Sequence, residues 1–172
     1  MLGSVTDRVI RTAPCPVLAI SKLPHDSSAT GEERGHVHHH LSRILFCTDF
    51  SENSERALNY AITTIAEYDA ELTLLHVLKD ISGASSIDEA IAMEQLDNLI
   101  PPEKPKAGRI RSRSIVRRGS AYEQIIQLAL EAQTDVVIMA VRGRGALNAA
   151  VFGSTTYRVI QLGPCPVLAV HV

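Results

Sequence analysis

Residues 140–154 read Ala-Val-Arg-Gly-Arg-Gly-Ala-Leu-Asn-Ala-Ala-Val-Phe-Gly-Ser, and they join an apolar run, residues 136–139, to a helical pattern that opens at Ser154. A buried strand, a glycine-bearing loop and a helix N-terminus in this order suit anion binding. Glycines let the backbone approach a phosphate closely, and the free N–H groups at a helix start point towards it. A connecting turn with glycines at its sharp bends explains the stretch equally well, so Gly143 and Gly145 alone decide nothing.

Strand-like and helix-like patterns alternate on both sides of this loop. Strands are expected at 44–47, 72–78, 109–118, 136–139 and 167–170, and helices at 57–65, 87–99, 120–132 and 154–162. The alternation predicts an α/β fold: a doubly wound, five-stranded parallel sheet with helices on both faces. Ligands bind such sheets beyond the strand carboxyl ends, where the strand order reverses. If the first and fourth strands are neighbours, Asp49 meets the glycine loop at that point.

An internal repeat divides the chain. Residues 3–20 echo residues 153–170, and each copy has a short helix, a Pro-Cys-Pro stop and a β-branched strand. We therefore expect the N-terminal segment to be the last helix and strand of a preceding copy of the same domain. The expected division is a remnant helix and strand (1–20), a polar linker (21–42) and a complete domain (43–172).

Composition limits the classes of function. The net charge is −2 and the pI about 6.4, which gives no general electrostatic support for binding nucleic acid or a membrane surface. No run approaches the roughly 20 apolar residues of a membrane span, and no signal-peptide pattern opens the sequence. The three cysteines lack CxxC spacing and are expected to be free thiols of a reducing compartment, so a cytoplasmic location is expected.

Two clusters of side chains have both a structural and a functional interpretation. The histidines within 36–40 could bind a metal, but a solvated linker is favoured because no cysteine or carboxylate cluster accompanies them. Arg109, Arg111 and Arg113 alternate on one face of a strand. They could contact an anion or RNA, but arginines at such positions more often protect an exposed sheet edge against pairing. Ser120 and Glu123 are expected to form a capping box.

Five segments together resemble the universal stress protein family. They are Ile-Leu-Phe-Cys-Thr-Asp-Phe-Ser at 44–51, Leu-Leu-His-Val at 74–77, Gly-Ser at 119–120, Val-Val-Ile-Met-Ala-Val-Arg-Gly at 136–143, and Gly-Ser-Thr-Thr-Tyr-Arg-Val-Ile at 153–160 with the following Pro-Cys-Pro-Val-Leu. The resemblance implies an adenine nucleotide alpha hydrolase-like, Rossmann-like fold. Members of the family commonly occur as tandem copies, in line with the repeat.

The ATP-binding branch of this family is marked by Gly, two residues, Gly, nine residues, then Gly-Ser or Gly-Thr. Counting back from Gly153 and Ser154, the second glycine falls on Gly143, and the first falls on Ala140. This is a departure from the motif. If the position needs a positive φ or close approach of the ligand, a Cβ there costs on the order of 1 kcal/mol, which weakens binding about fivefold to tenfold. Ala140→Gly is then expected to tighten ATP binding.

The resemblance implies a nucleotide site at matching positions. Asp49 bonds the nucleoside, Val77 and Met139 contact the adenine, and Gly143, Gly153 and Ser154 surround the phosphates, with Thr155 as a further donor. Arg142 and Arg144 could screen the phosphate charge, although exposed arginines are usually solvated. Asp49 could instead be only a helix-capping residue, and His76 is expected to be a packed strand histidine. The expected cofactor-binding residues are Thr48, Asp49, Val77, Met139, Ala140, Arg142, Gly143, Gly153, Ser154 and Thr155.

Binding without catalysis is the expected activity. The sequence contains no P-loop, no Gly-x-Ser-x-Gly elbow and no His-Glu-x-x-His, and we find no aligned nucleophile for phosphoryl transfer. The expected function is a cytosolic stress-response module that binds ATP, with or without Mg²⁺, as a regulatory protein and not an enzyme. A nucleotide-free dimeric interaction module and a slow ATPase are the alternatives. The resemblance implies a homodimer through the last strand, 166–171, and strand 16–21 could pair with that strand within one chain or across the dimer.

Overall fold

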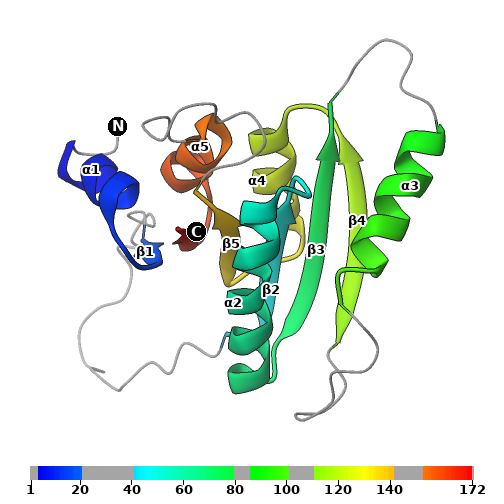
Figure 1. Cartoon of the computed structure of the whole chain (residues 1–172), viewed down its shortest axis with the longest axis horizontal. Coiled ribbons are helices and arrows are strands. Elements are labelled where there is room, and N and C mark those ends of the chain that lie inside the picture. Colours follow the sequence, from blue (N-terminus) through cyan, green and yellow to red (C-terminus); the bar gives the residue numbers. More distant parts are fainter. Residues whose placement is uncertain (1–3, 21–40, 80–85, 101–110, 142–152, 172) are drawn as a thin grey trace, which may run out of the picture.

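The computed structural model describes residues 4–20, 41–79, 86–100, 111–141 and 153–171 (Figure 1). Strands and helices alternate along the described residues, as the sequence predicts. The elements, in order, are α1 (Ser4–Thr12), β1 (Val17–Ala19), β2 (Arg43–Thr48), α2 (Glu52–Tyr68), β3 (Glu71–Leu78), α3 (Ser86–Asp97), β4 (Ser112–Arg118), α4 (Ala121–Glu131), β5 (Val136–Ala140), α5 (Ser154–Leu162) and β6 (Val167–Val170).

The strands form one six-stranded sheet in the order β1-β6-β5-β2-β3-β4. The five strands from β2 to β6 are mutually parallel, which confirms the predicted doubly wound α/β sheet. The chain runs outwards from β2 through β3 to β4, then returns to the other side of β2 to form β5 and β6 (Figure 1). The strand order therefore reverses between β2 and β5.

Two apolar layers cover the faces of the sheet. On one face, Phe46 and Ile138 are fully buried and pack against α2, and Leu96 of α3 belongs to the same cluster. On the other face, Leu45 and Val137 pack with residues of α4 and α5. Alternate residues of each strand enter opposite clusters, so strands covered on both faces are almost continuously apolar.

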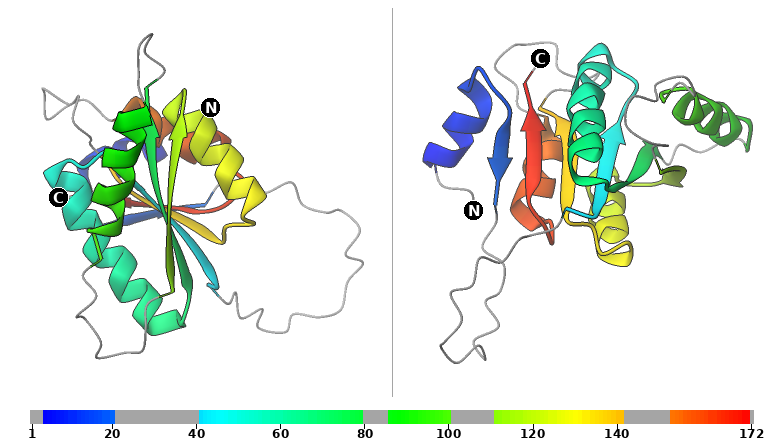
Figure 2. Two further views of the ribbon diagram at one scale, coloured as in Figure 1. Left: turned by 90° about the vertical axis from the view of Figure 1, so that its right-hand side faces the viewer. Right: turned by 90° about the horizontal axis from the view of Figure 1, so that it is seen from below.

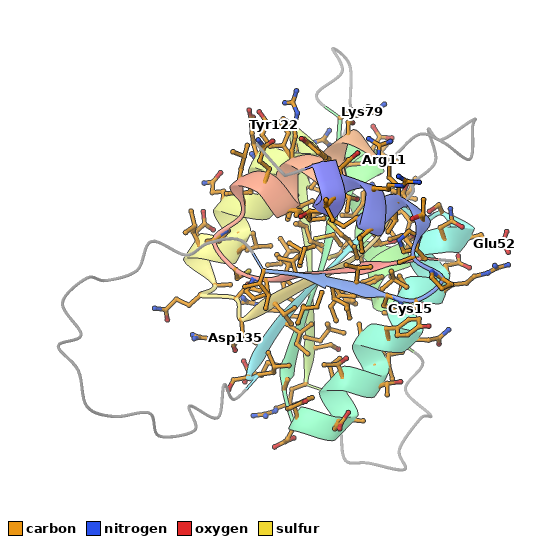
Figure 3. The ribbon with its side chains drawn as sticks, turned by 90° about the vertical axis from the view of Figure 1, so that its left-hand side faces the viewer. Arg11, Cys15, Glu52, Lys79, Tyr122 and Asp135 are labelled. Carbon is orange, nitrogen blue, oxygen red and sulfur yellow. The ribbon has the colours of Figure 1, made fainter. Side chains whose placement is uncertain are left out.

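The N-terminal segment adds a sixth strand that is not parallel to the others. β1 pairs antiparallel with β6, with Leu18 opposite Leu168, and lies beside it at the margin of the sheet (Figure 2). Pairing within one chain was one of the two arrangements expected for this segment. Ile10 of α1 is 1% exposed and joins the cluster formed by α4 and α5. Figure 3 shows α1 and α5 on the same side of the sheet.

Two local predictions need correction. The strand expected at 109–118 is assigned only from Ser112, and residues 109–110 lie outside the described part of the chain. Ser120 precedes α4 but its side chain makes no capping hydrogen bond, so the expected capping box does not form. β4 is an edge strand, as the arginine pattern predicts, and the Arg113 side chain turns back to donate to the Thr73 hydroxyl at 2.9 Å.

Candidate functional site

The carboxyl ends of β5, β2 and β3 lie side by side. Cys47 of β2 is in register with Met139 of β5, and Thr48 is in register with His76 of β3. Asp49 follows β2 directly, so it emerges at the point where the strand order reverses. The first and fourth strands of the domain are therefore neighbours, as the site prediction requires.

Met139 and Val77 of the predicted site lie on the side of the sheet that α4 and α5 cover, and Asp49 lies beyond the end of β2. Met139 is 6% exposed and lies in that cluster with Cys47, and Val77 is partly buried against it. Both are core residues first, as the sequence indicates. Asp49 lies two positions beyond Cys47 and is partly exposed, so its carboxylate stands past the strand end.

A hydrogen-bonded turn fixes Asp49 between β2 and α2. The Asp49 Oδ1 atom accepts from the Ser51 amide at 3.1 Å. Ser51 is the N-cap of α2, and its Oγ accepts from the Ser54 amide at 3.3 Å. Ser51, and not Asp49, is therefore the N-cap of α2, and Asp49 fixes the turn that leads into the helix by accepting from the amide of this cap.

Thr48 supports this turn from inside. Its side chain is buried, its Oγ1 lies 2.9 Å from the Ser54 Oγ, and it accepts from the Phe50 amide at 2.9 Å. These bonds hold Phe50 at a φ of 57°, a left-handed conformation that is rare for a bulky residue. Of the predicted site residues, Thr48 thus positions the turn rather than offering its hydroxyl to a ligand.

His76 has a role that its sequence context does not reveal. Its Nδ1 donates to the Thr48 carbonyl at 2.8 Å, and its ring lies 4.4 Å from the Phe50 ring centroid. His76 is a packed strand histidine, as expected, and its partners are the Thr48 carbonyl and the Phe50 ring. The register of β2 with β3 places His76 opposite Thr48, and this pairing is a tertiary fact that no local pattern encodes.

Ala140 ends β5 with its side chain on the opposite face of the sheet from Met139. It is 9% exposed and belongs to the cluster beneath α2. Its φ is not among the positive values, so the conformational reason to prefer glycine at this position does not hold. The methyl group instead fills part of the core.

The start of α5 is tied to the end of β5. The Thr156 hydroxyl donates to the Ala140 carbonyl at 3.0 Å, and the Gly153 amide donates to the Val141 carbonyl at 3.2 Å. A Cβ on Gly153 would lie 3.0 Å from that same carbonyl oxygen, a tight contact that favours glycine. Thr156 is buried and was missed by the sequence reasoning, which treated the first turn only as a source of donors.

Ser154 and Thr155 occupy the first turn of α5, where backbone N–H groups have no acceptor within the helix and the helix dipole is positive. Ser154 is exposed and Thr155 partly exposed, so this turn is accessible. Arg142, Gly143 and Arg144 of the predicted site lie outside the described residues, as do the histidines at 36–40. Within the described residues, no group of three or more His, Cys, Asp or Glu side chains could hold a metal ion.

The cysteines are free thiols, as predicted. Burial raises the pKa of the Cys47 thiol far above its ordinary value, with a further contribution from Cys165. Burial, and next the nearby Asp135 carboxylate, raise the pKa of Cys165 to about 11. Both groups stay protonated at neutral pH and lack the thiolate that cysteine chemistry requires.

A hollow of about 290 Å³ lies at the opposite, amino-terminal end of the strands. Arg43, Arg111 and Arg113 line it together with Glu71 and Thr73. Arg43 donates to the Gln133 Oε1 at 3.0 Å and Arg111 to the Asp69 carbonyl at 2.7 Å, so the described bonds direct these guanidinium groups to the protein itself.

None of the described helices is long and apolar enough to cross a membrane.

Comparison with known proteins gives consistent relatives. A universal stress protein of Thermus aquaticus is 28% identical over 133 residues, covering 74% of this chain and 97% of the relative. Universal stress protein Sll1654 of Synechocystis is 33% identical, covering 74% of this chain and 83% of the relative. The crystal structure of an Archaeoglobus fulgidus universal stress protein superposes with a TM-score of 0.68 at 25% identity, covering 99% of this chain and 56% of that one.

Two further solved structures of this fold contain adenine nucleotides. One is a universal stress protein in complex with cAMP, with a TM-score of 0.56 at 23% identity over 76% of this chain and 97% of that one. The other is the Archaeoglobus fulgidus universal stress protein in complex with dAMP, with a TM-score of 0.58 at 18% identity over 75% of this chain and 97% of that one. At these identities the likeness shows the fold.

The sequence match extends over the whole parallel part of the sheet. Residues 40–171 match the family model described as Universal stress protein family, a range that runs from just before β2 to the end of β6. Taken with the fold and the relatives, this shows that the chain belongs to the universal stress protein family.

Proposed function

We propose that the chain binds ATP, with or without Mg²⁺, beyond the carboxyl ends of β5, β2 and β3. The observation that carries the proposal is the pairing of β2 with β5, which brings Asp49 and the start of α5 to the same reversal of strand order. Such a reversal leaves a crevice that open α/β sheets use for ligands. Relatives of the same fold hold cAMP and dAMP, which supports an adenine nucleotide as the ligand class.

In this proposal, some of the described residues contact the nucleoside and others contact the phosphates. The partly exposed Asp49 carboxylate can accept hydrogen bonds from the nucleoside, and Val77 and Met139 offer apolar contact at the adjoining strand ends. The first-turn amides of Ser154 and Thr155 suit phosphate oxygens. The family motif adds Gly143 to the phosphate end, and we add Arg142 as a cation that screens the phosphate charge.

We propose a regulatory role in stress response, in the cytoplasm, without turnover. The Asp49 carboxylate is engaged in the turn before α2, which suits recognition better than activation of a nucleophile. A nucleotide-free interaction module is the second candidate. The observation in its favour is the Ala140 methyl, which packs in the core beneath α2 at a position where the motif has glycine.

Nucleotide binding is tested by titrating ATP into the purified chain and following its melting temperature and calorimetric heat. A ligand that binds only the folded state at 100 times its Kd adds about 2.7 kcal/mol to the free energy of unfolding. Asp49→Ala should weaken ATP binding about tenfold or more, because a charge-assisted hydrogen bond contributes roughly 1.5–3 kcal/mol.

Asp69→Asn is the matched control for Asp49→Ala. Asp69 caps the far end of α2 with its side chain 97% exposed, and asparagine tolerates its left-handed backbone. It should bind ATP like the wild type. A folded wild-type chain whose melting temperature stays constant up to millimolar ATP, and which releases no adenine nucleotide on denaturation, would refute the proposal and favour the nucleotide-free module.

A further inference from the structure

The antiparallel pair of β1 and β6 is symmetric in sequence as well as in geometry. Val17-Leu18-Ala19 repeats Val167-Leu168-Ala169 at an offset of 150 residues. In the structure Val17 pairs with Ala169, Leu18 with Leu168, and Ala19 with Val167. Exchanging each residue for its repeat equivalent turns the pair Val17–Ala169 into the pair Val167–Ala19, so the midpoint of Leu18 and Leu168 is a local two-fold centre.

The helices obey the same symmetry. α1 and α5 cover equivalent residues of the repeat, and both lie on the same side of the sheet (Figure 3). Ile10 and its equivalent Ile160 are 1% and 3% exposed and belong to the same core cluster. A two-fold axis perpendicular to the sheet keeps both helices on one face. This is the relation that two copies of one surface adopt in a symmetric, isologous dimer.

We propose that α1 and β1 occupy, within the chain, the place that α5 and β6 of a second copy would take. β6 then has both edges filled, by β5 on one side and β1 on the other, and the chain is a monomer at this seam. When the N-terminal segment leaves, the freed edge of β6 accepts β6 of a second chain. A homodimer through residues 166–171 is thus controlled by the N-terminal segment.

The docked segment is held less completely than its repeat equivalent, which makes its release feasible. Val9 is 46% exposed, whereas its equivalent Val159 is 1% exposed. Leu18 and Ile20 are 53% and 69% exposed. The described apolar anchors of the segment are Ile10 and Ala19, with Val17 partly buried. A short strand and a few anchors form a contact that another copy of β6 can replace.

The first test introduces charge at the two anchors, Ile10 and Ala19, in the 172-residue chain. Ile10→Asp with Ala19→Asp places unpaired carboxylates in apolar surroundings and should undock the segment. Val9→Asp with Leu18→Asp is the matched control, because the same elements gain the same charge at exposed positions. Sedimentation is measured over a wide concentration range, with circular dichroism to show that each variant is folded.

The wild type and the control should sediment as monomers of 18.7 kDa, and the anchor variant should become a dimer as its concentration rises. A wild type that dimerises as strongly as the anchor variant would overturn the proposal. A folded anchor variant that stays monomeric at the highest concentration would also overturn it.

The second test needs no disruption of the core. Leu18→Cys and Leu168→Cys, introduced together with Cys15→Ser, place two thiols at directly opposed positions of an antiparallel pair, within the range a disulfide spans. Oxidation should give a cross-link within one chain, and the locked protein should remain monomeric even with both anchors changed. Disulfide-linked dimers formed instead would show that the pair joins two chains, which contradicts the proposal.

Discussion

Ala140→Gly separates the structural role of this residue from its place in the nucleotide motif. The Ala140 methyl is buried between β5 and α2, on the face opposite Met139. Removing one buried methyl costs about 0.8 kcal/mol, and a glycine within a strand costs a further 0.5–1 kcal/mol or so in backbone entropy. The expected loss of stability is therefore about 1–2 kcal/mol, or roughly 3–7 °C in melting temperature for a domain of this size.

The same geometry predicts little gain in ATP affinity from Ala140→Gly. Since Ala140 does not adopt a positive φ, glycine releases no conformational strain at this position. We expect the Kd for ATP to change by less than about twofold, in contrast to the fivefold to tenfold gain predicted from the motif alone.

The assay combines thermal unfolding without ligand and isothermal titration with ATP. Ala169→Gly is the matched control, because Ala169 is a fully buried alanine of the neighbouring strand that faces the other cluster. Both variants should lose similar stability. A variant that retains the wild-type melting temperature and binds ATP at least fivefold more tightly would refute the reasoning and restore the motif as the deciding factor.

Four other predictions rest on described contacts and burial. Thr48→Val should lower the free energy of unfolding in urea by about 1–3 kcal/mol, because the partly buried Phe50 amide loses its acceptor. Thr156→Val should cost about 0.5–1.5 kcal/mol in the same assay, since the hydroxyl no longer bonds the carbonyl at the end of β5. In timed alkylation at pH 8, the exposed Cys15 should react long before Cys165, whose pKa is raised to about 11. Because the unfolded thiol of Cys165 loses its proton near its ordinary pKa of 9.0, stability should fall as pH rises from there towards 11.

The pattern of the sequence predicts the sheet and the proximity of β2 and β5, which places Asp49 beside the end of β5. Continuous apolar runs identify buried parallel strands, and strand order limits where a ligand can sit. The repeat predicts that β1 can pair with β6. β1 has the same sequence as the first three residues of β6, so it can occupy the free edge at which β6 would pair with a second β6 strand.

Contacts set by tertiary register escape prediction. His76 bonds the Thr48 carbonyl because β2 and β3 pair in one particular register, and no local signal specifies that register. The side chain of Ser120 has the right identity for a cap but makes no capping hydrogen bond. The face of Ala140 follows from strand alternation, but only the structure shows that its backbone does not adopt a positive φ.

Phe50 places backbone strain in the turn that follows β2. A bulky residue in the left-handed region stores about 1–3 kcal/mol, and its neighbours Thr48 and Ser51 hold it there through their bonds. A ligand that draws the Asp49 carboxylate away from the Ser51 amide would break one of these hydrogen bonds. Phe50 could then leave the left-handed conformation, and its ring would lose contact with the His76 ring. Ligand binding at the end of the sheet would then change the conformation of the first turn of α2. In this way a binding event at the strand ends could alter the outer surface of the protein.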